Sequence, residues 1–312
     1  MVVDRLRILY TMVNLIMRWL AIVALLSQAG CLKKIALTAV ANTIAEPGSG
    51  FSRDDDPELV RDALPVLMKT MEQLHEALPQ HRALLLAMVR AFTSYGVAFI
   101  EEQADRLQES NVEAARVLYA RCRRMFLRAR GYGLDGLELQ QPGFRAAWER
   151  AQTPDDRSRA LARMTREDVP LLYWTGAAWG SAVGAAKDDM KLVGELPKVE
   201  ALERRALELD ESYEEGAIHE FFITYGGAQH PDEAKQHLER ALALSHHKKL
   251  APLVSYAESV AVTRQDKKEF KRLLEEAAAF DVDSDPDHRL ANIIAQRRAR
   301  WLLSRTDELF AE

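Results

Sequence analysis

The sequence predicts an all-α protein built from antiparallel helical hairpins. Glycine and proline are scarce, with 15 and 11 in 312 residues, which argues against a β-sandwich that needs a turn every ~8–12 residues. Strong helix formers (Ala, Leu, Glu and Arg) dominate the composition. Apolar residues recur at three- and four-residue steps, as on one face of a helix, and no segment alternates strictly over the length of a strand.

The composition also excludes several classes of function. The chain is 48% hydrophobic and 29% charged, which is typical of a globular protein. Its formal charge is -5, so no nucleic-acid partner is expected. Two cysteines are too few for a disulfide scaffold or a cysteine-rich metal site. Cys122 lies at helical spacing among apolar residues and is expected to be buried.

The N-terminus predicts a bacterial lipoprotein signal peptide over residues 1–30. Arg5 and Arg7 form a basic start, residues 19–26 are uncharged, and small residues directly precede Cys31. This order is typical of a secretory signal. The cysteine at the cleavage position indicates that Cys31 carries the lipid, which anchors the mature chain to a membrane.

Two alternatives stay open at this end, an ordinary cleaved signal and an uncleaved anchor. The position three before Cys31 is Gln28, where lipoprotein signals usually have leucine. The run from Ile8 to Leu26 is long enough to span a membrane, although Arg18 near its middle would be costly there. Cleavage would remove three arginines and one aspartate, changing the charge from -5 to -7. Leu32, rather than aspartate, slightly favours the outer membrane.

Residues 31–53 are expected to form a lipid-anchored segment and flexible linker, and residues 54–312 a single helical domain. The acidic stretch before Pro57 predicts the start of the first long helix. Pro65 should kink or restart that helix, and Pro79 should end it. The turn at Gly131-Tyr132-Gly133 should separate two helices. Helical spacing predicts further helices over 81–107, 111–131, 143–151, 155–164, 169–186, 197–209, 213–228, 231–245, 248–263, 266–279 and 286–304.

The last third contains a degenerate internal repeat. Ala206, Ala241 and Ala277 occupy equivalent places in three similar stretches, with offsets of 35 and 36 residues. A helical hairpin of about 34 residues with alanine at the close crossing is the tetratricopeptide pattern. One hairpin cannot bury its apolar face alone, so the hairpins should stack as a tetratricopeptide-like superhelical array.

No catalytic, metal or cofactor motif is present. The pair His219-Glu220 lacks the second histidine of a zinc-protease motif. The adjacent His246 and His247 point about 100° apart on a helix, which is poor geometry for one metal. The stretch 281–285 resembles the start of a calcium loop but lacks its glycine and its final glutamate. We therefore expect a non-enzymatic protein without metal or cofactor.

Three windows hold candidate ligand residues, and each has a structural alternative. The window 171–181 places Tyr173, Trp174 and Trp179 beside small residues, which suits a ligand cavity or a tight helix crossing. Core packing is the alternative, because aromatic residues at helical spacing usually pack in cores. The second window contains His219 and Tyr225. The third, with Asn292, Gln296 and Arg297, suits a carboxylate ligand or is a solvated helix face.

These windows also carry a resemblance to a known family. The relevant stretches are DDDPELVRDALP (54–65), LLYWTGAAW (171–179), GAIHEFF (216–222), LERALALS (238–245) and RLANIIAQRRARWLLSRTDELF (289–310). Together with the signal and Cys31, they resemble the T-component (TatT) family of tripartite ATP-independent periplasmic (TRAP) transporters, in the same order and over nearly the whole mature chain.

The resemblance implies an all-helical periplasmic lipoprotein that associates with the solute-binding subunit of such a transporter. It also implies a homo-oligomer, a trimer, with a pore-like cavity in each subunit for a small apolar or organic-acid ligand. The predicted function is to bind or relay that ligand. The alternative is a scaffold lipoprotein that organises an envelope complex without a ligand. His246 and His247 depart from the small residues that the family pattern has there.

Overall fold

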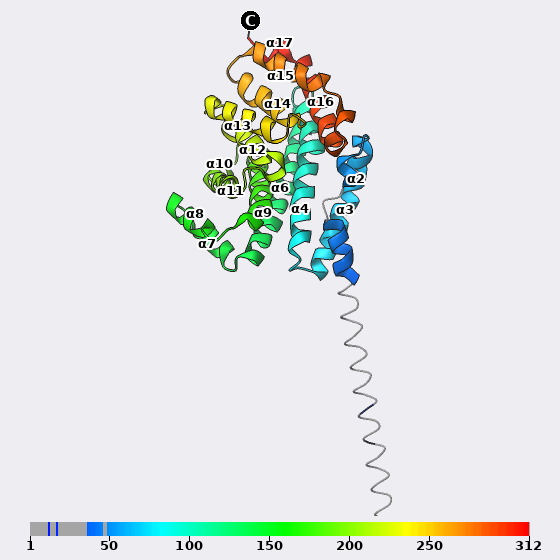
Figure 1. Cartoon of the computed structure of the whole chain (residues 1–312), viewed down its shortest axis with the longest axis vertical. Coiled ribbons are helices and arrows are strands. Elements are labelled where there is room, and N and C mark those ends of the chain that lie inside the picture. The colour runs from blue at the N-terminus through cyan, green and yellow to red at the C-terminus, as the bar shows by residue number, and fades with distance from the viewer. Residues whose placement is uncertain (1–11, 13–16, 18–35, 46–48, 312) are drawn as a thin grey trace, which may run out of the picture.

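The computed structural model describes residues 12, 17, 36–45 and 49–311, and every regular element in these residues is helical (Figure 1). The all-α prediction is therefore confirmed. The predicted signal peptide, apart from Met12 and Met17, lies outside the described residues, and so does Cys31.

The first half of the chain forms long helices that pack in order. A short helix over Ala36–Ala45 comes first, and its Ala41 is fully buried against α3 and α4. The elements that follow are α2 (Ser49–Ser52), α3 (Pro57–Ala77), α4 (Arg82–Tyr95), η1 (Gly96–Glu101), α5 (Glu102–Leu107), α6 (Val112–Gln140), α7 (Phe144–Arg150), α8 (Pro154–Leu161), η2 (Arg166–Asp168) and α9 (Val169–Gly184).

The second half consists of shorter helices that continue the stack. They are α10 (Met190–Val193), α11 (Leu196–Leu209), η3 (Tyr213–Glu215), α12 (Ala217–Gly226), α13 (Pro231–Leu244), α14 (Ala251–Tyr256), η4 (Ala257–Ala261), α15 (Lys267–Ala279), η5 (Val282–Ser284), η6 (Pro286–His288), α16 (Arg289–Ser304) and α17 (Thr306–Leu309). Most of the predicted segments agree with these bounds within a few residues.

Side-chain caps fix several helix starts. The Asp56 carboxylate accepts a hydrogen bond from the Leu59 N–H at 3.0 Å, and Pro57 fills the first helical turn. Asn111 caps α6 in the same way through the Ala114 N–H. These caps satisfy backbone donors that have no partner within the helix, so the sequence sets these boundaries locally.

One predicted break, the turn at 131–133, is wrong. The helix α3 continues through Pro65 without a restart, and the alternative expectation of a kink there stays a prediction. The helix α6 continues through the expected turn at 131–133 to Gln140. Gly133 is needed for close packing instead, because a Cβ there would overlap the Thr175 side chain on α9. Gly136 has the same role, since its Cβ would lie 2.8 Å from a methyl group of Leu171.

The core lies between consecutive helices. The central helices α4, α6, α9 and α11 pack side by side in that order, and fully buried side chains such as Leu84, Phe126, Leu172 and Leu202 fill the space between them. A second core joins α12 to α16, with Phe270, Leu274 and Ala299 fully buried.

Among the described residues, one helical stretch, Arg82–Leu107, has the length and apolar composition of a membrane span. Half of its most apolar window is buried inside the fold. Leu84, Leu85, Met88 and Val89 have no exposed surface. The stretch packs against α3 and α6, which gives its apolar residues a protein environment.

The alanines of the predicted repeat occupy equivalent places in the fold. Ala206 on α11, Ala241 on α13 and Ala277 on α15 each expose 1% of their surface or less. Along the chain, α12 follows α11, α14 follows α13 and α16 follows α15, and the two helices of each pair are in contact. The superhelical tetratricopeptide-like repeat itself stays a prediction.

The turn after α13 contains the two histidines that depart from the family pattern. His246 and His247 both have positive φ, 51° and 57°. This left-handed region favours glycine or asparagine, although histidine is also found there. The turn therefore keeps its shape with an unusual pair of residues.

The C-terminal helix packs back against the first helices of the chain. Figure 1 shows α16 beside α2 and α3, and residue contacts join these elements. Arg297 pairs with both oxygens of Glu58, and Arg298 lies 2.7 Å from Glu102 and from Asp105. Ion pairs thus join α16 to the first helices of the stack, and we call this contact the "closure".

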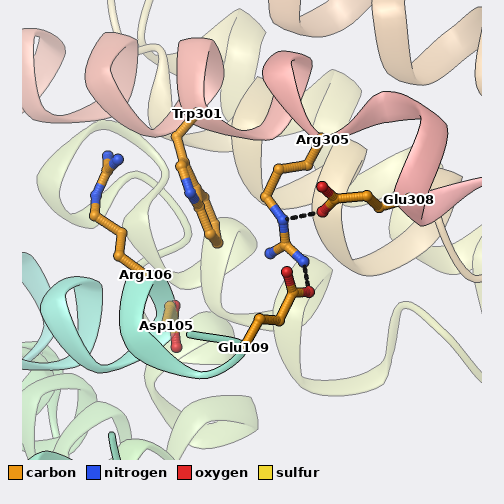
Figure 2. A pocket seen from close by; sticks show the side chains of 6 residues that line it. All are labelled: Asp105, Arg106, Glu109, Trp301, Arg305 and Glu308. Atoms are coloured by element: carbon orange, nitrogen blue, oxygen red, sulfur yellow. Dashed lines mark hydrogen bonds and ion pairs between the residues drawn. The ribbon is translucent and has the colours of Figure 1, made fainter. Parts of the chain in front are cut away.

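Figure 2 shows a pocket of about 150 Å³ at this closure. Trp301 lies between the guanidinium groups of Arg106 and Arg305, at 5.3 and 4.8 Å from the ring centroid. Arg305 pairs with Glu109 and with Glu308. Arg106 pairs with Glu102, and Asp105 pairs with Arg298. Each charged side chain that lines the pocket therefore already has a partner in the fold.

Candidate functional site

The most distinctive sequence window forms an aromatic cluster at the start of α9. Tyr173 meets Trp174 edge to face, with ring centroids 5.2 Å apart, and Tyr213 of η3 at 5.5 Å. The three rings form the "Tyr173 cluster". Tyr173 and Trp174 come from one helix and Tyr213 from the turn after α11, so the packing of α9 with α11 and α12 brings them together.

A charged pair borders the Tyr173 cluster. Arg90 of α4 pairs with the Glu214 carboxylate, and the Arg90 guanidinium lies 5.5 Å from the Trp174 ring centroid. The Tyr213 hydroxyl donates a hydrogen bond to the same carboxylate at 2.9 Å. Lys249 donates to the Glu214 carbonyl oxygen. Contacts from α4, from η3 itself and from the segment between α13 and α14 therefore converge on Glu214.

Glu214 and Glu215 have left-handed backbone conformations, with φ of 42° and 54°. This conformation costs free energy for residues other than glycine, and such strained residues are concentrated at functional sites. Here the contacts of Arg90, Tyr213 and Lys249 hold the strained turn in place.

The electrostatics around Tyr173 are dominated by buried carboxyl groups. Burial raises the pKa of Tyr173 well above 10, and Glu220, Glu203 and Glu214 raise it further. Burial also raises the pKa of Glu220, against the opposing effect of Lys249. The Tyr173 hydroxyl is therefore protonated at neutral pH and can donate a hydrogen bond.

Glu203 of α11 is the most unusual carboxyl group of this region. It is completely buried, and neither of its oxygens makes a hydrogen bond of normal geometry. It lies against Gly176, where a Cβ would come within 2.8 Å of the Glu203 Cδ atom. Burial raises its pKa well above 4.5. A buried carboxyl without partners costs free energy, and such groups are typical of functional sites.

Trp179 lies on another side of α9 from the Tyr173 cluster. Its indole N–H donates a hydrogen bond to Glu195 at 2.9 Å, and the Arg130 guanidinium lies 4.6 Å from its ring centroid. Arg130 and Glu195 also form an ion pair at 3.0 Å. These contacts join α6, α9 and the start of α11.

In the second sequence window, His219 forms a pair with another histidine. His219 on α12 and His237 on α13 approach with 2.8 Å between their Nδ1 atoms, and their rings lie 5.1 Å apart. Burial, and then the charge of His237, lowers the pKa of His219 to about 4. Tyr225 stacks on Phe221 at 5.3 Å and donates to the Leu196 carbonyl oxygen.

The third window holds chain segments together. Asn292 bonds to the Leu250 N–H and the Lys248 carbonyl oxygen, and Gln296 donates to the carbonyl oxygen of Phe280 at 2.7 Å. Arg297 pairs with Glu58 at the closure. The candidate ligand residues therefore lie in separate parts of the fold. Tyr173 and Trp174 lie together, and the other candidates lie away from this cluster: Trp179, His219, Tyr225 and the residues of the third window. Their proposed ligand roles stay predictions.

Sequence reasoning placed Glu220 in the second window but missed three charged residues of this region: Arg90, Glu203 and Glu214. One signal was available, because Glu203 interrupts the apolar face formed by Val199, Leu202 and Ala206. Arg90 and Glu214 are identified only by the tertiary contacts of α4 and η3.

Catalytic and metal chemistry find no support in the described part of the chain. No cluster there has the three or more His, Cys, Asp or Glu side chains that could hold a metal ion. Cys122 is fully buried, and burial raises the pKa of its thiol to about 12, which makes it a poor nucleophile.

The fold and this site define an all-α protein whose most distinctive cluster combines aromatic rings with buried carboxyl groups. The model of the TRAP transporter T-component family matches residues 53–310, and the chain belongs to that family. It is also similar to an uncharacterized protein of Treponema pallidum (strain Nichols), with 31% identity over 91% of this chain and 94% of the relative. The family is a transport-associated component and not an enzyme family, which indicates an envelope location.

Proposed function

We propose that this protein is a non-enzymatic, lipid-anchored periplasmic component that associates with the solute-binding subunit of a TRAP transporter. It binds or relays a small apolar or organic-acid ligand at the Tyr173 cluster. The lipid is attached to Cys31, the outer membrane is favoured, and the assembly is a homotrimer. Family membership supports the transporter system, and the features below support the ligand site.

One observation carries the ligand proposal. Tyr173 and Glu220 each keep part of their surface accessible, yet burial is the largest cause of the raised pKa of both groups. A side chain on the outer surface would be accessible and well solvated. We infer from this partial access together with desolvation that the two groups face a small internal space.

The chemistry of these groups suits a partly apolar acid. Aromatic rings bury apolar surface, and a few polar groups fix the orientation of a ligand. The protonated Tyr173 hydroxyl can donate a hydrogen bond to a carboxylate. Arg90 is already neutralised by Glu214, so the site favours one weak acid over a multiply charged anion.

The alternative function is a scaffold without a ligand. The ring contacts of Tyr173, edge to face with Trp174 and tilted with Tyr213, favour it, because rings at 5.2 and 5.5 Å also describe a filled core. The two functions differ in whether a small acid enters the protein.

Titration of tryptophan fluorescence with decanoate distinguishes them. Ala177 is half-buried on α9, three to four residues from Tyr173 and Trp174, so Ala177→Leu should fill the space and weaken decanoate binding at least about tenfold. Ala162→Leu, at an exposed position, is the control. Circular dichroism confirms that each variant folds. If decanoate fails to bind the wild type while co-purification with the solute-binding subunit persists, the scaffold function replaces the ligand function.

A further inference from the structure

We propose that the outward face of α6 is the docking surface for an acidic face of the solute-binding subunit. The choice of this partner rests on the proposed function above. The surface is defined by Arg116, Val117, Arg121 and Arg124, and we call it the "α6 basic face".

The charge of α6 is opposite to that of the chain. No aspartate or glutamate occurs between Glu113 and Asp135, and the chain as a whole has a formal charge of -5. The same stretch contains six arginines and no lysine: Arg116, Arg121, Arg123, Arg124, Arg128 and Arg130. A concentrated positive region in an acidic protein attracts a partner of negative charge.

The periodicity of α6 places half of these arginines outward. The buried residues Ala115, Cys122, Phe126, Ala129 and Gly133 form one face toward α4 and α9. At 100° per residue, positions 117, 120 and 124 lie roughly opposite that face, and 116 and 121 lie about 70° to either side of that direction. All five side chains are exposed.

Ion pairs account for the other three arginines. Arg123 pairs with Asp189, Arg128 with Glu72 and Arg130 with Glu195, which are bonds to neighbouring helices. Within the described residues, Arg116, Arg121 and Arg124 have no ion pair. Their charge is therefore available to a partner without breaking any bond of the fold.

Apolar surface accompanies this free charge. Val117 is 60% exposed within the face, and Val112 at the start of the helix is 68% exposed. On the flank, where Arg123 pairs with Asp189, Met190 is 75% exposed. Exposed apolar side chains surrounded by arginine are the composition of a protein interface, in which arginine and methionine are enriched and lysine is depleted.

A membrane surface fits this composition less well. Helices that lie on anionic lipids present Trp, Phe or Leu between their basic residues. On the α6 basic face the apolar residue is a short valine. The observations therefore favour a protein partner, and its surface must carry carboxylates to match three free guanidinium groups.

The test uses the full-length, lipidated protein in detergent and the solute-binding subunit of the same transporter. Binding is measured by biolayer interferometry at 50 and 300 mM NaCl. The triple variant R116E/R121E/R124E should bind at least about tenfold more weakly than the wild type at the lower salt concentration, and its binding should no longer weaken at higher salt. The control R150E/R163E/R264E changes the same charge at exposed arginines elsewhere and should bind within twofold of the wild type.

Each other outcome overturns the inference. Equal binding by the wild type and the α6 variant would place the interface elsewhere and leave the proposed function intact. If the wild type fails to bind, both the inference and the proposed partner are lost. Loss of binding to vesicles with 30% phosphatidylglycerol, with unchanged binding to the subunit, would assign the face to a membrane. A changed oligomeric mass of the variant alone would assign it to a contact between copies.

Discussion

The buried carboxyl group of Glu203 should make the protein less stable as the pH rises. Its pKa is raised well above 4.5 in the folded protein by burial, so the folded chain keeps a proton that the unfolded chain releases. The sign follows from linkage. The contribution of the protonated Glu203 to the free energy of unfolding is fully present below pH 4.5 and is lost as the pH rises toward the folded pKa. Each pH unit costs about 1.4 kcal/mol while this difference lasts.

The loss between pH 4.5 and 7 is therefore at most about 3 kcal/mol, the value for a carboxyl that keeps its proton over this whole range. Glu203→Gln has nearly the same shape and cannot ionise. The variant should equal the wild type near pH 4.5 and exceed it in the free energy of unfolding by up to about 3 kcal/mol at pH 7.

Urea denaturation from pH 4.5 to 8, followed by far-ultraviolet circular dichroism, measures this difference. Glu208→Gln on the same helix is the control, because Glu208 is exposed and its surface ion pair with Arg205 contributes little. Parallel stability curves for the wild type and Glu203→Gln would refute the reasoning, since they would show that Glu203 ionises normally in the folded protein.

Three further predictions concern packing, the closure and the histidine pair. Gly176→Ala should destabilise the protein by about 1–3 kcal/mol in thermal unfolding, because its Cβ overlaps a buried carboxyl group, whereas Gly184→Ala has open space and should not. Arg298→Met leaves two of its three partner carboxylates, Asp105 and Glu258, without a cation and should cost about 3–5 kcal/mol in urea unfolding; an equal loss in Arg300→Met would contradict a specific role for the closure. The pKa of His219 is lowered to about 4, so stability is present above pH 6.5 and is lost as the pH falls toward 4. In urea titrations, the free energy of unfolding of His219→Gln should fall less steeply with decreasing pH than that of the wild type. An unchanged slope would show that the pKa of His219 is not lowered in the folded protein.

The helical fold was largely predictable from local chemistry. Caps such as Asp56 and Asn111, and the three- and four-residue apolar spacing, act within one or two turns of a helix, so they can be read without the fold. The error at 131–133 has a tertiary cause. A glycine inside a helix is unfavourable by itself, but the packing of α6 against α9 makes Gly133 necessary.

The candidate site was predictable only in part. The aromatic window around Tyr173 and Trp174 stands out in the sequence because large rings alternate with small residues. Its charged neighbours come from helices that are far apart along the chain, such as Arg90 on α4 and Glu214 after α11. No spacing rule connects them.

The sequence by itself determined the helical class, the helix starts and the family pattern, because these depend on local propensity and on motifs of consecutive residues. The tertiary structure alone decided which charges are paired and which are buried. Arg297 and Arg116 read alike in the sequence, yet one joins Glu58 at the closure and the other stays free on α6. Glu203 interrupts an apolar helix face in the sequence, but only the packing of α9 shows that its carboxyl group is buried. Burial and pairing depend on what packs against a side chain, and that is fixed only when distant helices meet.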